Sequence, residues 1–138
     1  MNFASARIIT DHVDRLVEFY EKITGVSAQR PAPVFAEFVL PSCTLAIAHA
    51  QTAQLFGPGS VEAGSNRTVI LEFRVDDIEA EFRRLQPWVD DWVLDPTTMP
   101  WGNRSMLFRD PDGNLLNFFE PVSKEAKRRF SSRENLGR

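Results

Sequence analysis

Hydrophobic and polar positions follow two periods along the chain, one typical of strands and one typical of helices. Apolar residues recur at intervals of three and four over 13–23 and 78–85, which predicts two amphipathic helices. Short apolar or alternating runs between turn residues predict strands. These predicted strands cover 3–10, 34–40, 43–49, 67–75, 91–94, 104–109 and 114–120. The pattern therefore predicts strand, helix and hairpin twice, in the same order.

Boundary residues indicate where the two predicted helices begin and end. The first helix begins at Asp11 or His12 and ends at Gly25, because glycine commonly closes a helix. The second extends from position 77 to about 86 and ends at a proline. Asp76 and Glu79 have the spacing of a capping pair at its start.

The chain also aligns with itself, which indicates an internal repeat. Residues 8–14 match 73–79 at an offset of 65, and the two hairpins match at an offset of 70. Each half is too small to bury a good core alone, so we expect the two halves to fold together. We predict one domain over 1–122, with modules at about 1–57 and 66–122.

Composition and charge narrow the class of protein. The 138 residues are 43% hydrophobic, without an apolar run long enough to span a bilayer or a visible secretory signal, so we expect a cytoplasmic domain. One Cys and two His exclude a zinc cluster rich in either residue. Residues 123–138 carry six basic and two acidic side chains on a net-acidic body. We expect this basic tail to be a solvated helix or a frayed end, and we expect no nucleic-acid partner.

Three stretches carry a resemblance to a known family. They are ITDHVDRLVEFYEKITG at 9–25, VILEFRVDDIEAEF at 69–82 and WGNRSMLFRDPDGNLLNFFEP at 101–121. In these stretches the chain resembles the vicinal oxygen chelate superfamily of glyoxalase I, bleomycin-resistance proteins, fosfomycin-resistance enzymes and extradiol dioxygenases. The resemblance implies an α+β glyoxalase-like fold, with two βαβββ modules forming a curved mixed sheet around a cavity. It also implies a homodimer.

The resemblance further implies where a divalent metal would be held. Enzymes of the superfamily use His or Glu at one position in the first strand and one in the last strand of each module. Carried over to this chain, those positions are Ser5, Ile47, Ile70 and Asn117. Aliphatic side chains cannot coordinate a cation, and neutral oxygens alone are weak ligands, so we expect no metal and no other cofactor. A displaced site from His49 and Glu72 is the alternative.

Strand alternation predicts which side chains line the cavity. Arg7 and Glu72 occupy equivalent positions and form either a pair presented to a ligand or a structural pair of buried charges. Trp101 is a candidate for stacking on a ligand at the cavity mouth. In the later strands, Leu45, Ile47, His49, Leu115, Asn117 and Phe119 are predicted to face inward. The candidate ligand-binding residues are Ser5, Arg7, Ile47, His49, Ile70, Glu72, Trp101, Asn117 and Phe119.

Four functions follow from these observations. The first is a metal-free protein that binds a small organic molecule and sequesters a drug or metabolite, as the bleomycin-resistance branch does. The second is an enzyme that uses Glu72 as general base. The third is a lyase, isomerase or dioxygenase with shifted metal ligands, and the fourth is a structural or regulatory domain with a filled cavity. We favour the first, as a homodimer without nucleic-acid or membrane partners.

Overall fold

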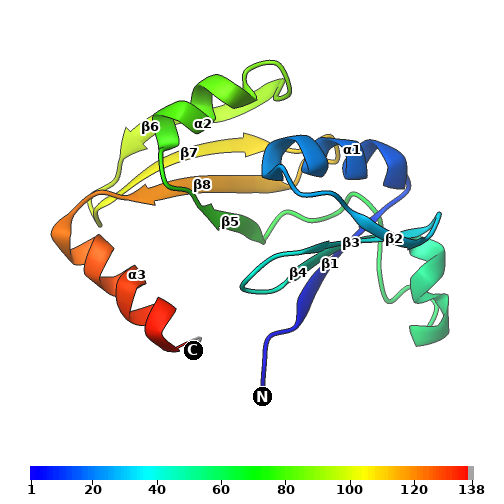
Figure 1. The fold of residues 1–138 in the computed structure, drawn as a ribbon. Coiled ribbons are helices and arrows are strands. Elements are labelled where there is room, and N and C mark those ends of the chain that lie inside the picture. The colour runs from blue at the N-terminus through cyan, green and yellow to red at the C-terminus, as the bar shows by residue number, and fades with distance from the viewer. Residues whose placement is uncertain (137–138) are drawn as a thin grey trace. The chain divides into compact units, whose positions relative to one another are not determined.

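The computed structural model describes residues 1–136, with side chains described up to residue 133. The chain divides into two compact units, which we call the first and second units (Figure 1). The first unit contains 1–68 together with the turn at 110–114, and the second contains the rest. Within the described residues, no helix combines the length and the hydropathy needed to cross a membrane.

The first unit contains one four-stranded sheet and helix α1. Its elements are β1 (Ser5–Thr10), α1 (Val13–Thr24), β2 (Gln29–Ala32), β3 (Phe35–Val39), β4 (Thr44–His49) and the short 3₁₀ helix η1 (Ala50–Phe56). The strand order is β1-β4-β3-β2, with β1 parallel to β4 and the other pairs antiparallel. The sequence pattern predicted neither β2 nor η1.

The second unit repeats this arrangement and adds a C-terminal helix. Its elements are β5 (Ile70–Arg74), α2 (Ile78–Leu85), β6 (Asp91–Thr98), β7 (Asn103–Arg109), β8 (Leu115–Pro121) and α3 (Lys124–Leu136). The strand order is β5-β8-β7-β6, with β5 parallel to β8. Each unit thus has the βαβββ order, and the predicted α+β glyoxalase-like fold is confirmed.

Two local predictions in the second unit were wrong. The Asp77 carboxylate, not that of Asp76, caps α2 by accepting the Ala80 N–H at 3.1 Å. Strand β6 extends through Pro96, beyond the predicted end at 94. It is an edge strand, where a missing backbone N–H is tolerated. The predicted tail helix is present as α3, and its last two predicted residues lie outside the described part.

The register of the first sheet separates its side chains into two faces. Ile8 of β1 pairs with Ile47 of β4, so both point to the same side, and Arg7 points to the other. Ile47 is fully buried. Phe38 of β3 shares its face, and its ring lies 6.1 Å from the ring of Tyr20 in α1. The face of Ile47 is therefore the core beneath α1, and the face of Arg7 is the first open face.

This register corrects the predicted orientation of β4. Leu45, Ile47 and His49 were predicted to share the cavity side with Arg7, but they lie on the opposite face. In the second unit Glu72 pairs with Asn117, whereas its equivalent Arg7 pairs with Ala46. The offset between the hairpins is therefore one residue longer than the predicted 70. A slip of one residue transfers a whole strand to the other face.

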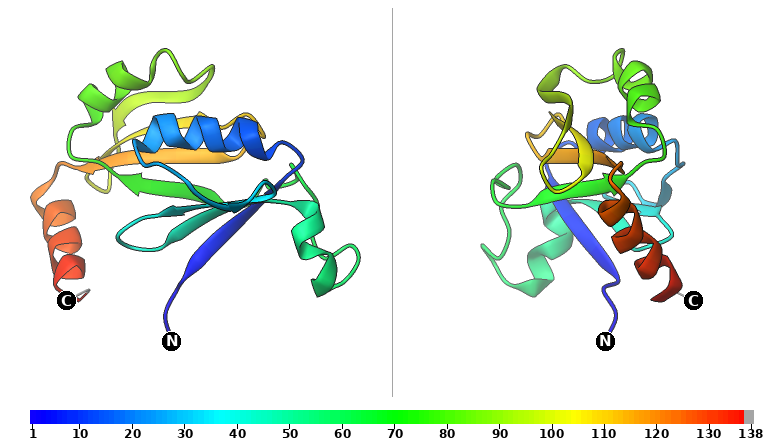
Figure 2. Two further views of the ribbon diagram at one scale, coloured as in Figure 1. Left: turned by 45° about the vertical axis from the view of Figure 1, so that its right-hand side comes forward. Right: turned by 90° about the vertical axis from the view of Figure 1, so that its left-hand side faces the viewer.

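The second sheet also has one face under a helix and one open face. The ring of Phe82 in α2 contacts Trp92, which contacts Phe108, and these rings form the core face. Glu72 and Asn117 lie on the other side, in agreement with the predicted alternation. This second open face comprises Ile70, Glu72, Arg74, Asn103, Ser105, Leu107, Arg109, Leu115, Asn117, Phe119 and Pro121. Helix α3 extends from the end of β8 on that side, opposite α2 (Figures 1 and 2).

Candidate functional site

A polar pair lies at the centre of the second open face. Glu72 and Asn117 are direct neighbours on the parallel strands β5 and β8. The Asn117 side-chain amide donates to Oε2 of Glu72 at 2.7 Å. An ionised carboxylate only accepts hydrogen bonds, so the NH₂ group of the amide must face Glu72. Asn117 Oδ1 is thereby directed away from Glu72.

Two buried oxygen atoms on this face lack a hydrogen-bond donor. Within the part of the chain that the structure describes, these unpartnered side-chain atoms are Oδ1 of Asn117 and Oδ1 of Asn103. The two residues lie on the adjacent strands β8 and β7, with side chains on the same side of the sheet. Because a buried acceptor without a donor costs about 1–3 kcal/mol, such atoms are uncommon. This face therefore holds two acceptors without a donor, one on Asn117 and one on Asn103, which lies opposite Pro121, four residues from Asn117 along β8.

Apolar side chains lie near the Asn117 acceptor on this face. Ile70 is 49% exposed, whereas Leu107 and Leu115 are half-buried and Phe119 is buried. Apolar contact area beside placed polar groups is a feature of sites that bind small organic molecules. The predicted residues Ile70, Glu72, Asn117 and Phe119 are thus brought together on one face, and Asn103 lies further along that face, opposite Pro121. Sequence reasoning missed Asn103, although its even spacing from Leu107 along β7 could have indicated it.

The first open face carries Arg7 between aromatic rings. The Arg7 guanidinium lies 5.1 Å from the ring centre of Phe35 and 5.8 Å from that of Phe56, which belongs to η1. Such cation–π contacts hold the guanidinium against the sheet. Glu72 has its partner within the second unit. The pairing of Arg7 with Glu72 stays a prediction.

The remaining predicted residues lie elsewhere. Ser5 is exposed at the start of β1, and Trp101 is 59% exposed in the turn before β7. His49 Nδ1 accepts the Gln51 N–H, and its Nε2 lies 3.9 Å from the Asp11 carboxylate. His49 also lines a pocket of about 580 Å³ with residues of η1 and the following loop. The sequence did not predict this pocket, because η1 was interpreted as part of a loop.

The donor set does not fit a divalent metal. With the corrected register, the last-strand position of the first unit is occupied by Ala46 instead of Ile47, and both are aliphatic. Among the described residues, no three side chains of His, Cys, Asp or Glu are grouped so that they could hold an ion. Ser5 and Asn117 would offer only neutral oxygens, which bind divalent cations weakly without a carboxylate.

Comparison with known proteins identifies the family. The sequence model of the Glyoxalase/Bleomycin resistance protein/Dioxygenase superfamily matches residues 2–118. The chain belongs to this superfamily. The match ends at residue 118, within β8, and does not include α3. A search of curated proteins finds no match.

Solved structures of the superfamily have the same fold. A glyoxalase/bleomycin resistance protein/dioxygenase from Nocardioides is 25% identical, with a TM-score of 0.74 over 90% of this chain and 85% of that chain. A family enzyme from Burkholderia phytofirmans PsJN is 16% identical, with a TM-score of 0.79 over 88% of this chain and 100% of that one. A glyoxalase-related enzyme from Fulvimarina pelagi is also 16% identical, with a TM-score of 0.75 over 91% of this chain and 94% of that one.

Proposed function

We propose that this superfamily member binds a small organic molecule on the second open face without a metal ion, and so sequesters a drug or metabolite. The observation that carries this proposal is the buried, unpartnered acceptor on Asn117 beside the Glu72 carboxylate, with a second such acceptor, on Asn103 opposite Pro121, further along the same face. A donor from the ligand removes the cost of leaving those oxygens unpaired. The apolar side chains around them supply contact area for the body of the ligand.

The polar groups favour a ligand that carries hydrogen-bond donors. At the Asn117–Glu72 pair the free amide oxygen and the carboxylate both accept, so an amine or another donor-rich group complements this pair better than a second carboxylate does. Hydrogen bonds that involve a charged group are about twice as strong as neutral ones, which favours a protonated amine at Glu72. The net charge of −3 also attracts a cation weakly.

A screen followed by titration tests this proposal. Apolar amines and matched neutral aromatic compounds are first screened by thermal shift, and each hit is titrated by calorimetry. We expect Asn117→Leu to weaken binding of an amine hit at least tenfold, because the substitution removes the acceptor and keeps the size. Glu62→Gln, in an exposed loop of the first unit, is the control and should leave the affinity within twofold. Equal affinity of the Asn117→Leu variant and the wild type would contradict the proposal.

A second candidate is an enzyme with Glu72 as general base. The Asn117 amide holds one carboxylate oxygen of Glu72, which orients this exposed side chain on the open face. Each hit from the screen is therefore incubated with the protein and analysed for products by mass spectrometry. Product formation that Glu72→Gln abolishes, with binding retained, favours the enzyme. Binding without conversion favours sequestration.

We also propose that the chain forms a homodimer, with a second copy covering an open face. Val69 and Ile70 are both about half exposed at the start of β5. A dimer in which these side chains contact the second copy would remove their apolar surface from water. Light scattering coupled to gel filtration tests this. The mass of two chains supports the proposal, and the mass of one chain at 100 µM contradicts it.

A further inference from the structure

Helix α3 is held at its start against the second unit. The Ser123 hydroxyl accepts the Ala126 N–H at 3.0 Å and so caps the helix, while the N–H of Ser123 donates to the Gly102 carbonyl. The turn at Gly102 is so close that a Cβ there would lie 2.0 Å from Ser123 Oγ. Because both the backbone and the side chain of Ser123 are held, the direction in which α3 leaves β8 is fixed.

This direction places the ring of Phe130 on the second open face. The ring lies 5.2 Å from the ring of Phe119, and the guanidinium carbon of Arg74 lies 5.9 Å from its centre. Phe119 and Arg74 are direct neighbours on β8 and β5, and each lies two residues beyond a member of the polar pair. Two residues of a strand span about 7 Å. Phe130 therefore lies beside the next pair of residues along the face.

The exposure of side chains differs between the two ends of this face. Phe119 is 8% exposed, and Ser105, its neighbour on β7, is 3% exposed. On the other side of the polar pair, Ile70 is 49% exposed, and Leu115, its neighbour on β8, is half-buried. The second open face is therefore closed at the Phe119 end and open at the Ile70 end.

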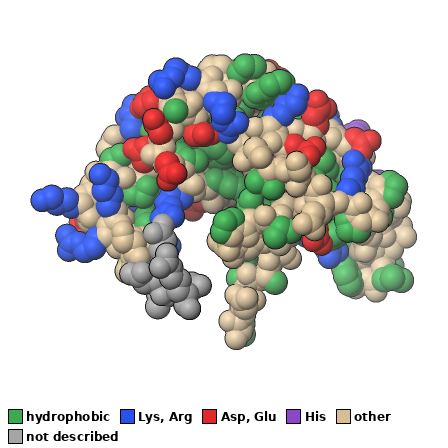
Figure 3. All heavy atoms as spheres, viewed as in Figure 1, with side chains coloured by type: hydrophobic (Ala, Val, Ile, Leu, Met, Phe, Trp, Pro, Cys, Tyr) green, Lys and Arg blue, Asp and Glu red, His purple; other side chains and the backbone are tan. Residues whose placement is uncertain are grey.

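Phe130 is the residue of α3 that makes this contact. Of the α3 side chains that the structure describes, all are exposed except Ala126, which is buried, and Phe130, which is half-buried. Figure 3 shows Lys and Arg side chains gathered over the helix. Ala126 packs against the turn at Gly102. Among the side chains described, this leaves Phe130 as the apolar group of α3 that lies on Phe119.

We propose that Phe130 determines which ligands the second open face accepts, because it closes the Phe119 end. The proposal rests on the function proposed above, in which a protonated amine binds at the polar pair. With the Phe119 end closed, the apolar body of that amine lies over Ile70 and Leu115. The ligand is therefore an amine with one large apolar substituent, since a second substituent directed toward α3 meets Phe130 instead of a free apolar surface.

Two amines that differ by one apolar group test this selectivity. Benzylamine carries one benzyl group and dibenzylamine carries two, and both are cations at neutral pH. We expect the wild type to bind them with affinities within about threefold of each other. Phe130→Ala uncovers Phe119, so this variant should bind dibenzylamine at least tenfold more tightly than benzylamine, because the second ring then leaves water for an apolar surface. Calorimetric titration measures each affinity.

Two further variants separate selectivity from stability. Ser131→Ala changes an exposed residue of the same helix without a change in net charge, and its preference between the amines should equal that of the wild type. Phe130→Leu keeps an apolar side chain on Phe119 and should give an intermediate preference, which carries the test if circular dichroism shows that Phe130→Ala loses α3. A merely structural role would change both affinities by one factor, and an unchanged ratio in the Phe130 variants would overturn the proposal.

Toluene separates this inference from the proposed function, because it has no donor for the polar pair. In amide NMR spectra it should cause saturable shifts at Phe119 in the Phe130→Ala variant and none in the wild type. Equal shifts in the two proteins would overturn the closure by Phe130, and so would a tenfold preference for dibenzylamine in the wild type. If toluene behaves as expected and neither amine binds the wild type, only the proposed function is contradicted.

Discussion

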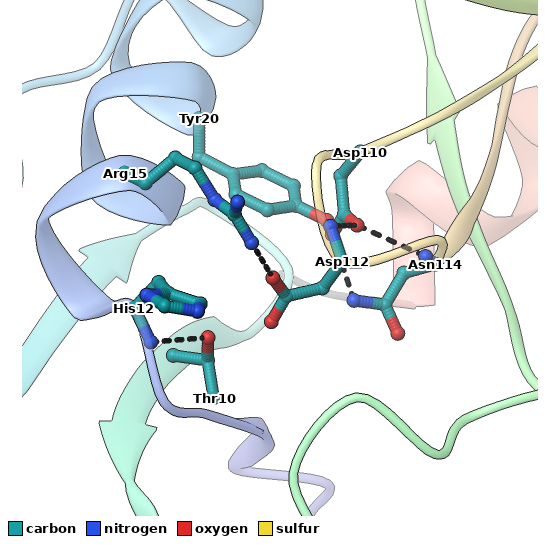
Figure 4. A network of polar contacts seen from close by, with 7 residues as sticks. All are labelled: Thr10, His12, Arg15, Tyr20, Asp110, Asp112 and Asn114. Atoms are coloured by element: carbon teal, nitrogen blue, oxygen red, sulfur yellow. Dashed lines mark hydrogen bonds and ion pairs between the residues drawn. The ribbon is translucent and has the colours of Figure 1, made fainter.

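The phenol of Tyr20 in α1 donates a 2.7 Å hydrogen bond to Oδ2 of Asp110, a residue ninety positions further along the chain. Asp110 lies in the turn between β7 and β8, which belongs to the first unit (Figure 4). Its other oxygen accepts the N–H groups of Asp112 and Asn114, and Oδ2 also accepts the Asn114 amide. Arg15 of α1 pairs with Asp112 at 2.6 Å. This buried carboxylate thus connects the turn of the second repeat to the helix of the first.

Tyr20→Phe should destabilise the fold by about 1.5 kcal/mol, because hydrogen bonds to charged groups contribute about 1.5–3 kcal/mol and Asp110 keeps its other donors. Denaturant unfolding of the wild type, Tyr20→Phe, Asp110→Asn and the double variant measures this. In that double-mutant cycle we expect the two substitutions to be non-additive by about 1 kcal/mol. Additive losses would mean that the hydroxyl and the carboxylate do not interact.

Alkaline pH should destabilise the protein through the same residue. Burial raises the pKa of Tyr20 well above its usual value, and the negative charges of Asp110 and Asp112 add to this shift. The folded state therefore keeps the phenol proton at a pH at which the unfolded chain loses it. This contribution to stability is complete below about pH 10 and is lost above it, at about 1.4 kcal/mol per pH unit.

The measurement compares the free energy of unfolding of wild type and Tyr20→Phe from pH 8 to 11. The phenylalanine variant cannot lose that proton, so its disadvantage should shrink as the pH passes 10. Other groups that titrate in this range are common to both proteins and cancel in the difference. A constant difference between the two proteins up to pH 11 would contradict the raised pKa.

Local patterns were enough to predict much of the fold. The spacing of apolar residues predicted α1, which ends at Gly25 in the left-handed conformation, and DPDG predicted the last hairpin. Strand β2 was missed because its sequence, QRPA, is polar and contains Pro31. Its extended conformation comes from pairing with β3, a contact that no local pattern encodes.

The candidate site was predicted less completely, because it depends on register. Glu72 and Asn117 each lie at alternating positions that the sequence can identify, and both were found. Ile47 was assigned to the wrong face because the aligned Pro41 and Pro111 suggested an offset that is one residue short. The unpartnered oxygen of Asn117 is a consequence of three-dimensional packing and could not be predicted from the sequence.

The corrected helix cap gives a matched pair of substitutions. Asp77→Ala should cost about 1 kcal/mol, because it removes the acceptor for the Ala80 N–H. Asp76→Ala removes the same charge one residue earlier, where the side chain does not cap α2, and should cost less than about 0.5 kcal/mol. Thermal and denaturant unfolding measure both. Equal losses, or a larger loss for Asp76→Ala, would contradict the assigned cap.

The corrected face of β4 is tested by comparing Ile47 and Ile70, which were both predicted from the sequence to line the cavity. Ile47 is fully buried beneath α1, so Ile47→Ala should cost about 2–5 kcal/mol of folding free energy. Ile70 is 49% exposed on the second open face, so Ile70→Ala should cost less than about 1.5 kcal/mol. A ligand of the second open face should bind more weakly to the Ile70→Ala variant. A mild effect of Ile47→Ala on stability would mean that Ile47 faces outward, as the sequence suggested.

Divalent metals should neither stabilise the protein nor be needed for its stability. An ion that binds only the folded state at a hundred times its Kd adds about 2.7 kcal/mol, a clear rise in Tm. Because Ser5, Ala46, Ile70 and Asn117 offer only neutral oxygens or no donor, we expect Tm to be unchanged by 1 mM Ni²⁺, Zn²⁺, Mn²⁺ or Fe²⁺ and by a chelator. Elemental analysis of purified protein measures bound metal directly. Near-stoichiometric metal that is lost in His49→Ala or Glu72→Gln would instead support the displaced site and metal-dependent chemistry.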